Sequence, residues 1–269
     1  MKRGEITPGS AWALVTGGGS GIGRCYALRL AKLGYHVLIV GERVAPLQEV
    51  VEEIKQTSHQ EARYLSLDLA RVEAGDELYA YTREEGLQIN VLINNAGMFS
   101  FCDILNTPSE RIERILLLHD MTTSKLCRLF AQDMIERNVK GYILNMSSYS
   151  IWMPFPGMAL YSASKAYLKS FSEAFSREVQ DRGVTVTTIC PAGVATNLYG
   201  LAPRLQKLGL RLGILISPDN CARRGLRALW KHRRVIVPDW WNRIWIPLCK
   251  HLPMCILRPI RRYTMQFQK

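Results

Sequence analysis

The sequence places a tyrosine and a lysine four residues apart, Tyr161 and Lys165, and the tyrosine follows Ser148 by thirteen residues. Four-residue spacing on a helix puts two side chains on the same face, one turn apart. A phenol with a pKa of about 10 is a poor acid or base at neutral pH, and a nearby ammonium group lowers that pKa. A serine hydroxyl aimed at the same point can hold a carbonyl or alkoxide oxygen. These three side chains therefore predict general acid–base chemistry.

A glycine-rich turn lies near the start of the chain, between an apolar run at 11–16 and a helical pattern at 24–33. Strand, glycine turn and helix together bring backbone N–H groups and a helix N-terminus to a pyrophosphate. Glycine at these positions allows the tight turn, the close approach of the phosphates and the close packing of the helix. We therefore predict a dinucleotide site formed by Gly17, Ser20, Gly21, Ile22 and Gly23.

Two charged residues, Glu42 and Arg43, follow the second predicted strand at 36–40. An acidic residue at this point accepts a hydrogen bond from the ribose 2′-hydroxyl of NAD, whereas an arginine suits the 2′-phosphate of NADP. The two residues favour opposite cofactors, and a solvated charge pair explains them equally well. The choice between NAD and NADP therefore stays open.

Asp68 ends the third predicted strand, at 62–67, and Leu69 follows it. The aspartate has two interpretations. It can hydrogen-bond the adenine of the cofactor, with Leu69 beside it, or it can cap a helix that begins at Ala70.

The order of the predicted elements defines the fold class. Six strands that alternate with helices require right-handed crossovers and therefore a parallel, doubly wound α/β sheet of the Rossmann type. The candidate residues follow strand carboxyl ends, where the ligands of such sheets bind. We predict one such domain over residues 1–238 and a basic, amphipathic C-terminal extension over 239–269. The expected strands are 11–16, 36–40, 62–67, 91–93, 142–146 and 184–189, with a final short one at 235–237, and the longer expected helices are 45–56, 109–137, 161–181 and 218–231.

The motifs in this order and spacing resemble those of the short-chain dehydrogenase/reductase family over about residues 8–198, and most closely 3-oxoacyl reductases and 17β-hydroxysteroid dehydrogenases. The segments that carry the resemblance are 16–23, 94–97, Ser148, Tyr161 with Lys165, and 191–196. The resemblance implies an NAD(P)(H)-dependent oxidoreductase acting on an alcohol/carbonyl pair. It also implies further cofactor contacts from Asn94, Ala96, Gly97, Pro191, Val194 and Thr196.

The resemblance assigns catalytic roles to the three residues named first. Tyr161 protonates the carbonyl or deprotonates the alcohol, Ser148 hydrogen-bonds the substrate oxygen, and Lys165 holds the nicotinamide ribose and lowers the tyrosine pKa. One position departs from the family pattern, which has an asparagine in the fourth helix that holds a water of the proton relay. That position is His119 here, or Asp120 with a shift of one residue. A histidine can bind water and titrate near neutrality, or it can simply be packed and hydrogen-bonded.

The positive charge of the chain lies in its last quarter. Residues 1–198 carry 20 Lys/Arg and 21 Asp/Glu, a net charge of −1, whereas residues 199–269 carry 15 and 2, a net charge of +13. The leucine-rich segment 197–217 is the substrate lid by the resemblance, and its basic edge suits an acyl chain or sterol with an anionic group. The alternative is an amphipathic helix packed on the core.

The segment 239–269 combines tryptophans, aliphatics and arginines, with no acid after Asp239. That composition predicts peripheral contact with a membrane surface, and the alternative is a contact between subunits of a homo-oligomer. The basic residues interleave with aliphatics rather than forming a solvated groove, so we expect no nucleic acid partner.

Seven scattered cysteines without metal-ligand spacing predict free thiols, no metal site and a reducing compartment. We expect no signal peptide and no membrane-spanning helix, and therefore a cytoplasmic protein, free or at a membrane surface.

The expected activity is reduction of a keto group on a hydrophobic, lipid-like substrate: 3-oxoacyl, 3-ketosphinganine-like or steroid. The alternatives are oxidation of a hydroxysteroid or bile-acid alcohol, and a cofactor-binding module with little turnover, which only His119 favours.

Overall fold

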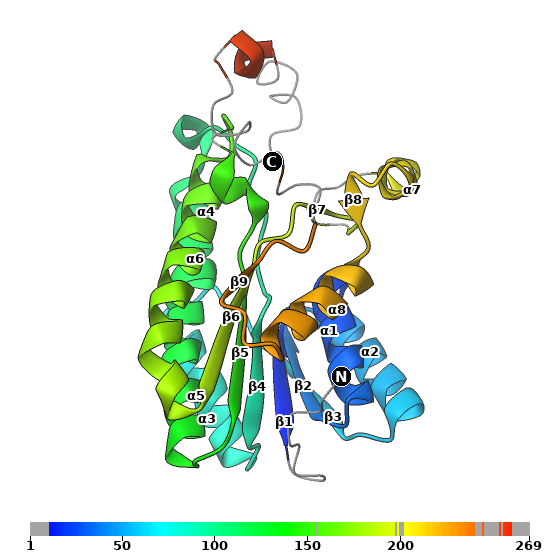
Figure 1. Cartoon of the computed structure of the whole chain (residues 1–269), viewed down its shortest axis with the longest axis vertical. Coiled ribbons are helices and arrows are strands. Elements are labelled where there is room, and N and C mark those ends of the chain that lie inside the picture. Colours follow the sequence, from blue (N-terminus) through cyan, green and yellow to red (C-terminus); the bar gives the residue numbers. More distant parts are fainter. Residues whose placement is uncertain are drawn as a thin grey trace.

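The computed structural model describes residues 11–153, 155–196, 198, 202–239, 244, 253 and 255–259. Its centre is a seven-stranded sheet in the order β3-β2-β1-β4-β5-β6-β9, and every neighbouring pair of strands is parallel (Figure 1). This order reverses direction at β1, as in doubly wound sheets, so the predicted fold class is confirmed. The strands are β1 (Trp12–Thr16), β2 (His36–Gly41), β3 (Ala62–Ser66), β4 (Ile89–Asn94), β5 (Gly141–Met146), β6 (Val184–Ile189) and β9 (Val235–Ile236).

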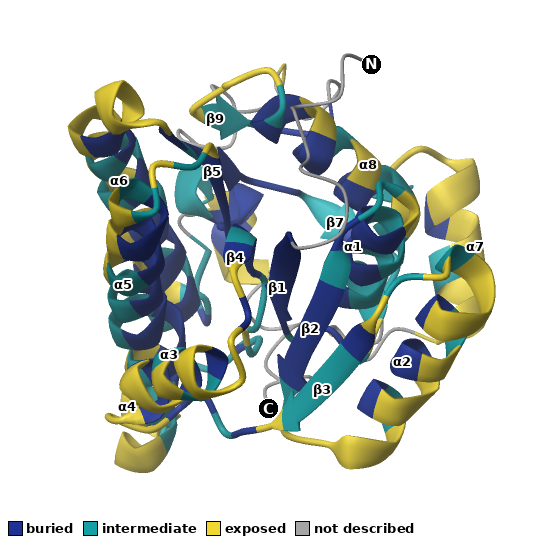
Figure 2. Cartoon of the chain, turned by 90° about the horizontal axis from the view of Figure 1, so that it is seen from below, coloured by how far each residue is buried: buried dark blue, intermediate teal, exposed yellow. Residues whose placement is uncertain are grey.

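Helices cover both faces of the sheet because each strand alternates its side chains between two cores. Ala13 and Val15 of β1 belong to one buried cluster, and Trp12 and Leu14 belong to the other. Figures 1 and 2 show the first group of helices on one face and the second group on the other. The first group is α1 (Gly21–Lys32), α2 (Val44–Ser58) and α8 (Pro218–Leu229), and the second is α3 (Ala74–Glu84), α4 (Ser109–Leu116), α5 (Thr123–Glu136) and α6 (Ala159–Val179).

The single helix expected over 109–137 is interrupted. Leu117–Thr122 form a π-helical turn between α4 and α5. A π turn adds one residue to the helical repeat and changes which side chains face the sheet after it. His119 lies in this turn and is fully buried. The interruption therefore lies at the one position where the sequence departs from the family pattern.

One further helix differs from the sequence prediction, and the predicted final strand is confirmed. Helix α3 begins at Ala74 rather than at Ala70, and β9, the short strand predicted at 235–237, extends the sheet to seven strands by pairing with β6. Short 3-10 helices occupy Ile104–Asn106, Tyr149–Trp152 and Gln180–Arg182, and Gly183 ends the last of them at a positive φ of 85°. A glycine in the left-handed conformation commonly ends a helix in this way.

The described part of the segment predicted as a lid, 197–217, lies outside the seven-stranded sheet. β7 (Gly193–Val194) pairs in parallel with β8 (Leu215–Ile216), and α7 (Pro203–Arg211) lies between them in the chain. No helix among the described residues has the length and apolar character needed to cross a membrane. Most of the predicted tail, 239–269, lies outside the described residues, as does Asn197.

Candidate active site

A cavity of about 400 Å³ opens where β1, β4, β5 and β6 end. The glycine turn and Tyr161 lie on its wall, so the structure brings the two main predicted motifs together. The predicted residues that line it are Gly17, Ser20, Gly21, Ile22, Arg43, Ala96, Gly97, His119, Ser148, Tyr161, Lys165, Pro191, Val194 and Thr196. Residues that line it without having been assigned to the site are Asn95, Met98, Met146, Ser147 and Leu198.

The three candidate catalytic side chains come from two neighbouring elements. Ser148 follows β5, where its Oγ accepts a hydrogen bond from the Ser150 N–H at 3.1 Å, and Tyr161 lies in the first turn of α6. The serine and tyrosine side chains are hydrogen-bonded to each other. Lys165 lies one turn further along α6, with its Nζ 5.9 Å from the centre of the Tyr161 ring, and donates to the Met146 carbonyl at 3.0 Å. All three side chains are buried.

Burial governs the protonation of this group. It raises the pKa of Tyr161 to about 12, with the hydrogen bond to Ser148 acting in the opposite direction. It lowers the pKa of Lys165 to about 8, against the attraction of Asp120. The expected net lowering of the tyrosine pKa is therefore not found, because desolvation of the phenolate outweighs the groups that favour it. A phenol that keeps its proton at neutral pH is suited to donate one.

His119 links the cavity wall to α6 through both ring nitrogens. Nε2 accepts a hydrogen bond from the Met98 N–H at 3.1 Å, and Nδ1 lies 2.9 Å from Ser164 Oγ. Ser164 Oγ donates to the Tyr161 carbonyl at 2.9 Å, so Nδ1 is the protonated nitrogen that donates to the serine. Burial, and then Lys165, holds the pKa of His119 well below its ordinary value, in agreement with this neutral form.

Asp120, the residue reached by a one-residue shift, does not line the cavity but interacts electrostatically with Lys165. Its Oδ1 is buried and has no hydrogen-bond partner among the described residues. Burial raises the pKa of Asp120 to about 7, and the ammonium of Lys165 acts against that rise. His119 therefore bonds to the backbone of Met98, and Asp120 acts electrostatically on Lys165.

The glycine turn has the shape that a phosphate cradle needs. Gly17 has a φ of +64°, and a Cβ on Gly23 would lie 2.1 Å from the Gly17 carbonyl oxygen. The side-chain amide of Asn95 donates to the carbonyls of Thr16 at 3.0 Å and Gly17 at 3.3 Å, which braces the turn against the end of β4. A side-chain-free turn at the start of α1 fits the pyrophosphate of a dinucleotide.

Asn94 does not line the cavity, contrary to the expectation. Its side-chain amide donates to Asn145 Oδ1 at 2.8 Å, and the amide of Asn145 donates to Ser172 Oγ at 2.8 Å. These buried bonds tie β4 to β5 and β5 to α6. Asn95, the first residue after β4, lines the cavity instead.

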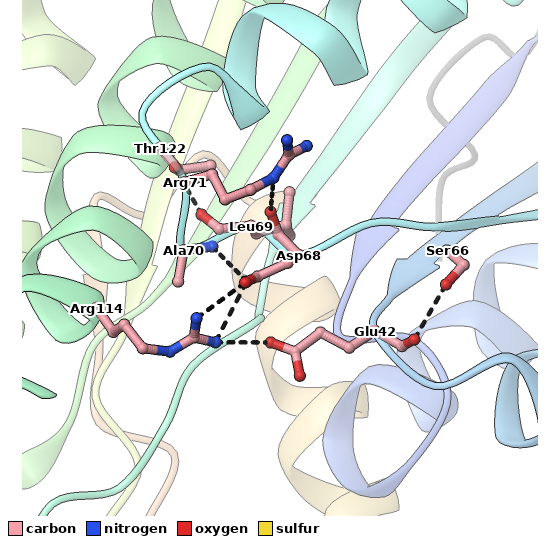
Figure 3. Close-up of polar contacts among 8 residues, drawn as sticks. All are labelled: Glu42, Ser66, Asp68, Leu69, Ala70, Arg71, Arg114 and Thr122. Atoms are coloured by element: carbon pink, nitrogen blue, oxygen red, sulfur yellow. Dashed lines mark hydrogen bonds and ion pairs between the residues drawn. The ribbon is translucent and has the colours of Figure 1, made fainter. Parts of the chain in front are cut away.

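Two of the residues predicted at the adenosine end, Glu42 and Asp68, form an ion-pair cluster around Arg114 of α4 (Figure 3). Arg114 Nη1 lies 2.9 Å from Asp68 Oδ2, and Nη2 lies 3.3 Å from Glu42 Oε1. Neither Glu42 nor Asp68 lines the cavity, whereas Arg43 does. Arg114 was missed because it lies more than forty residues after either carboxylate in the sequence.

The capping alternative for Asp68 is wrong in its detail. Asp68 Oδ1 accepts a hydrogen bond from the Ala70 N–H at 2.8 Å, but the helix that follows, α3, begins only at Ala74. Burial alone would raise the pKa of Asp68, but the hydrogen bonds from Ala70 and Arg114 outweigh it, and the pKa lies below its ordinary value. Leu69 is buried in the core rather than in the cavity.

The fold and the cavity define a doubly wound nucleotide-binding protein, and comparisons with known proteins place it more closely. The family described as short chain dehydrogenase matches residues 11–203, so the chain belongs to the short-chain dehydrogenase family. A short-chain dehydrogenase from Sphingobium yanoikuyae, solved in complex with NADPH, superimposes with a TM-score of 0.76 at 25% identity, covering 91% of this chain and 96% of that one.

Two relatives with different names are similar to most of this chain. The chain is 36% identical over 192 residues to 17-beta-hydroxysteroid dehydrogenase type 3 of Mus musculus, and 35% identical over 205 residues to very-long-chain 3-oxoacyl-CoA reductase of Rattus norvegicus. These matches cover 69% and 73% of this chain. They span only 60% and 64% of the two relatives.

Proposed function

We propose that this chain is an NAD(P)(H)-dependent oxidoreductase that reduces a keto group on a lipid-like substrate: 3-oxoacyl, 3-ketosphinganine-like or steroid. The observation that carries the proposal is that one cavity is lined by Ser148, Tyr161 and Lys165 and by the glycine turn. The names of the two relatives support the substrate class, since one names a hydroxysteroid and the other a very-long-chain 3-oxoacyl thioester.

We propose a task for each of these side chains. Ser148 donates a hydrogen bond to the substrate carbonyl oxygen and so holds it beside Tyr161. The Tyr161 hydroxyl, protonated at neutral pH because burial raises its pKa, gives its proton to that oxygen as negative charge develops there. The buried Lys165 ammonium stabilises the phenolate that remains. A nicotinamide cofactor, when bound, supplies the hydride to the carbonyl carbon.

The residues that would hold the cofactor are those of the glycine turn, the loop after β4 and the loop after β6. Gly17, Ser20, Gly21 and Ile22 suit the pyrophosphate. Lys165 suits the hydroxyls of the nicotinamide ribose, as the family resemblance implies. The choice between NAD and NADP rests on Arg43, which reaches the cavity, and on Glu42, which is paired with Arg114. This arrangement favours NADP.

The opposite direction uses the same residues, because a deprotonated Tyr161 is the base that an alcohol oxidation requires. Oxidation of a hydroxysteroid or bile-acid alcohol is therefore the second candidate. A cofactor-binding module with little turnover is less well supported. Both ring nitrogens of His119 are hydrogen-bonded within the protein. The histidine therefore fits the site structurally and gives the module little support.

The location, membrane contact and oligomeric state of the enzyme are also proposals. The composition of 239–269 supports peripheral contact with a membrane, with the chain on the cytoplasmic side. The family resemblance supports a homo-oligomer. Residues 1–238 would then form the catalytic domain, with the tail as a separate surface element.

Titration of the purified chain with NADH and NADPH, followed by nicotinamide fluorescence, tests the proposal. A medium-chain 3-oxoacyl thioester and a 3-ketosteroid are then added in turn. Binding followed by loss of the reduced nicotinamide with either carbonyl supports the proposal and shows which substrate branch applies. Binding without turnover favours the module, and failure of both cofactors to bind contradicts the dinucleotide site itself.

A further inference from the structure

Helix α7 exposes leucines that an ordinary amphipathic helix would bury. Leu205, Leu208 and Leu212, the last directly after the helix, expose 55%, 50% and 60% of their surface. They recur at intervals of three and four residues and therefore form one stripe. Figure 1 shows α7 standing out from the body of the protein. Exposed apolar stripes of this kind mark surfaces that bind something.

A different side of the helix holds it to the protein. A Cβ on Gly209 would lie 2.7 Å from the Leu215 side chain, so the backbone of α7 packs directly against β8. The Gln206 side chain donates to the Thr196 carbonyl at 3.4 Å. Among the described residues, the leucine stripe therefore stays exposed although α7 is attached to β8, and the alternative of an apolar side packed on the core is wrong.

A second stripe of positive charge runs beside the leucines. Arg204, Lys207 and Arg211 each precede one of the three leucines by a single residue. Since successive residues are about 100° apart around a helix, the two stripes are neighbours. No aspartate or glutamate occurs from Asn197 to Pro218. The exposed surface of α7 is therefore apolar and cationic, with no anionic side chain of its own to neutralise it.

We propose that α7 docks on a lipid bilayer that contains anionic lipid. The leucine stripe enters the boundary between headgroups and acyl chains, and the basic stripe pairs with lipid phosphates. A second copy of the chain fits this surface less well. A two-fold contact through α7 would bring the basic stripe of one copy toward the same stripe of the other, and like charges repel.

Docking through α7 places the rim of the active-site cavity at the bilayer. Thr196, which is bonded to Gln206 of α7, lines the cavity, and so does Leu198. An apolar substrate could then enter from the lipid without crossing water. The docking surface is independent of the proposed reaction and goes beyond the contact proposed for 239–269.

Sedimentation of the chain 1–269 with phosphatidylcholine vesicles, with and without phosphatidylserine, tests this surface. We expect binding that is stronger with phosphatidylserine. The triple variant L205Q/L208Q/L212Q, which keeps 239–269 intact, should bind at least about tenfold more weakly. The variant R204Q/K207Q/R211Q should lose most of the preference for phosphatidylserine. Leu105, 95% exposed and distant in sequence, provides the control L105Q, which should bind like the parent.

Hydrogen exchange locates the contact with vesicles, and gel filtration measures the oligomeric state of each variant. Residues 203–211 should exchange more slowly when vesicles are present, in the parent and in L105Q. Cofactor fluorescence and circular dichroism of the triple variant should match the parent, since the substituted side chains are exposed. Unchanged vesicle binding by the triple variant would overturn the proposal. Absence of vesicle binding by the parent would also overturn it, as would conversion of a dimer to a monomer by the triple variant without vesicles.

Discussion

The active-site cavity and helix α7 depart from the usual distribution of residues in opposite ways. In the cavity, Tyr161, Lys165 and His119 are polar or ionisable and yet buried. On α7, leucines are exposed beside basic residues. Thr196 connects the two regions, since it lines the cavity and bonds to α7.

The buried ionisable groups and the exposed leucines are both unfavourable in free energy, but they are compensated in different ways. Buried ionisable groups are tolerated where hydrogen bonds and opposite charges compensate them, and the bonds of His119 and Lys165 supply that compensation. Exposed leucines gain nothing in water and become favourable only when a partner covers them. The buried groups of the cavity are therefore compensated within the protein, whereas the exposed leucines of α7 become favourable only against an external surface.

Loss of the acid should produce the largest effect on the cavity. We expect Tyr161→Phe to lower kcat by roughly 10²–10⁴-fold, the usual contribution of a general acid, and to leave the Kd of the reduced cofactor nearly unchanged. Steady-state kinetics and nicotinamide fluorescence measure the two quantities. Tyr167→Phe is the control, because Tyr167 is exposed on the same helix and bonds to Ser124. Equal activity of Tyr161→Phe and the parent would remove the assigned acid.

Removal of the Ser148 hydroxyl should have a smaller effect. We expect Ser148→Ala to lower kcat/KM by roughly 10–100-fold, since the hydroxyl donates to an oxygen that becomes charged. Ser162→Ala is the matched control, because the Ser162 hydroxyl is buried and has no hydrogen-bond partner among the described residues. If both variants lost the same activity, Ser148 would have only a structural role.

The charge of Asp120 should affect the pH profile. Activity is expected to fall as the pH rises through the pKa of Lys165, which burial lowers to about 8 and Asp120 raises. Asp120→Asn removes that raising charge, so the alkaline limb of the kcat profile should move to lower pH, by roughly half a unit to one unit. The exposed Glu110 provides the control Glu110→Gln. A shift to higher pH, or none, would contradict the electrostatic link.

Cofactor preference should show the smallest of these effects. We expect Arg43→Ala to weaken NADPH binding by roughly 5–30-fold, the strength of one charge-assisted bond to phosphate, and to affect NADH little. Glu42→Ala should change both affinities less, because Glu42 is paired with Arg114. A marked loss of NADH affinity in Glu42→Ala would show that the glutamate binds the ribose and that NAD is preferred.

Most of the sheet and of the cavity could be predicted from the sequence because those signals are local. The apolar strands, the glycine turn and the four-residue spacing of Tyr161 and Lys165 each lie within a few residues. Parallel topology then brings the strand carboxyl ends to one edge. The cavity lining agrees with this for the glycine turn, Ser148 and the α6 pair.

What the sequence could not show depends on contacts between distant segments. Helix α3 buries Ala74, Gly75, Leu78 and Thr82, a face with only one large apolar residue, so its periodicity is weak. The π turn around His119 is a change of register that periodicity does not reveal. The pairing of Arg114 with Glu42 and Asp68, and the burial that raises the Tyr161 pKa, arise only when the sheet has assembled.

Transfer of a deuterium label tests the central claim most directly. The parent enzyme is supplied with NADPH or NADH that carries two deuterium atoms at the reactive nicotinamide carbon and with the 3-oxoacyl thioester or the 3-ketosteroid, and the product is analysed by mass spectrometry. We predict a secondary alcohol with one deuterium on its carbinol carbon, formed by the parent and not, within the same time, by Tyr161→Phe. An alcohol without deuterium, or equal labelled product from both proteins, would contradict the account.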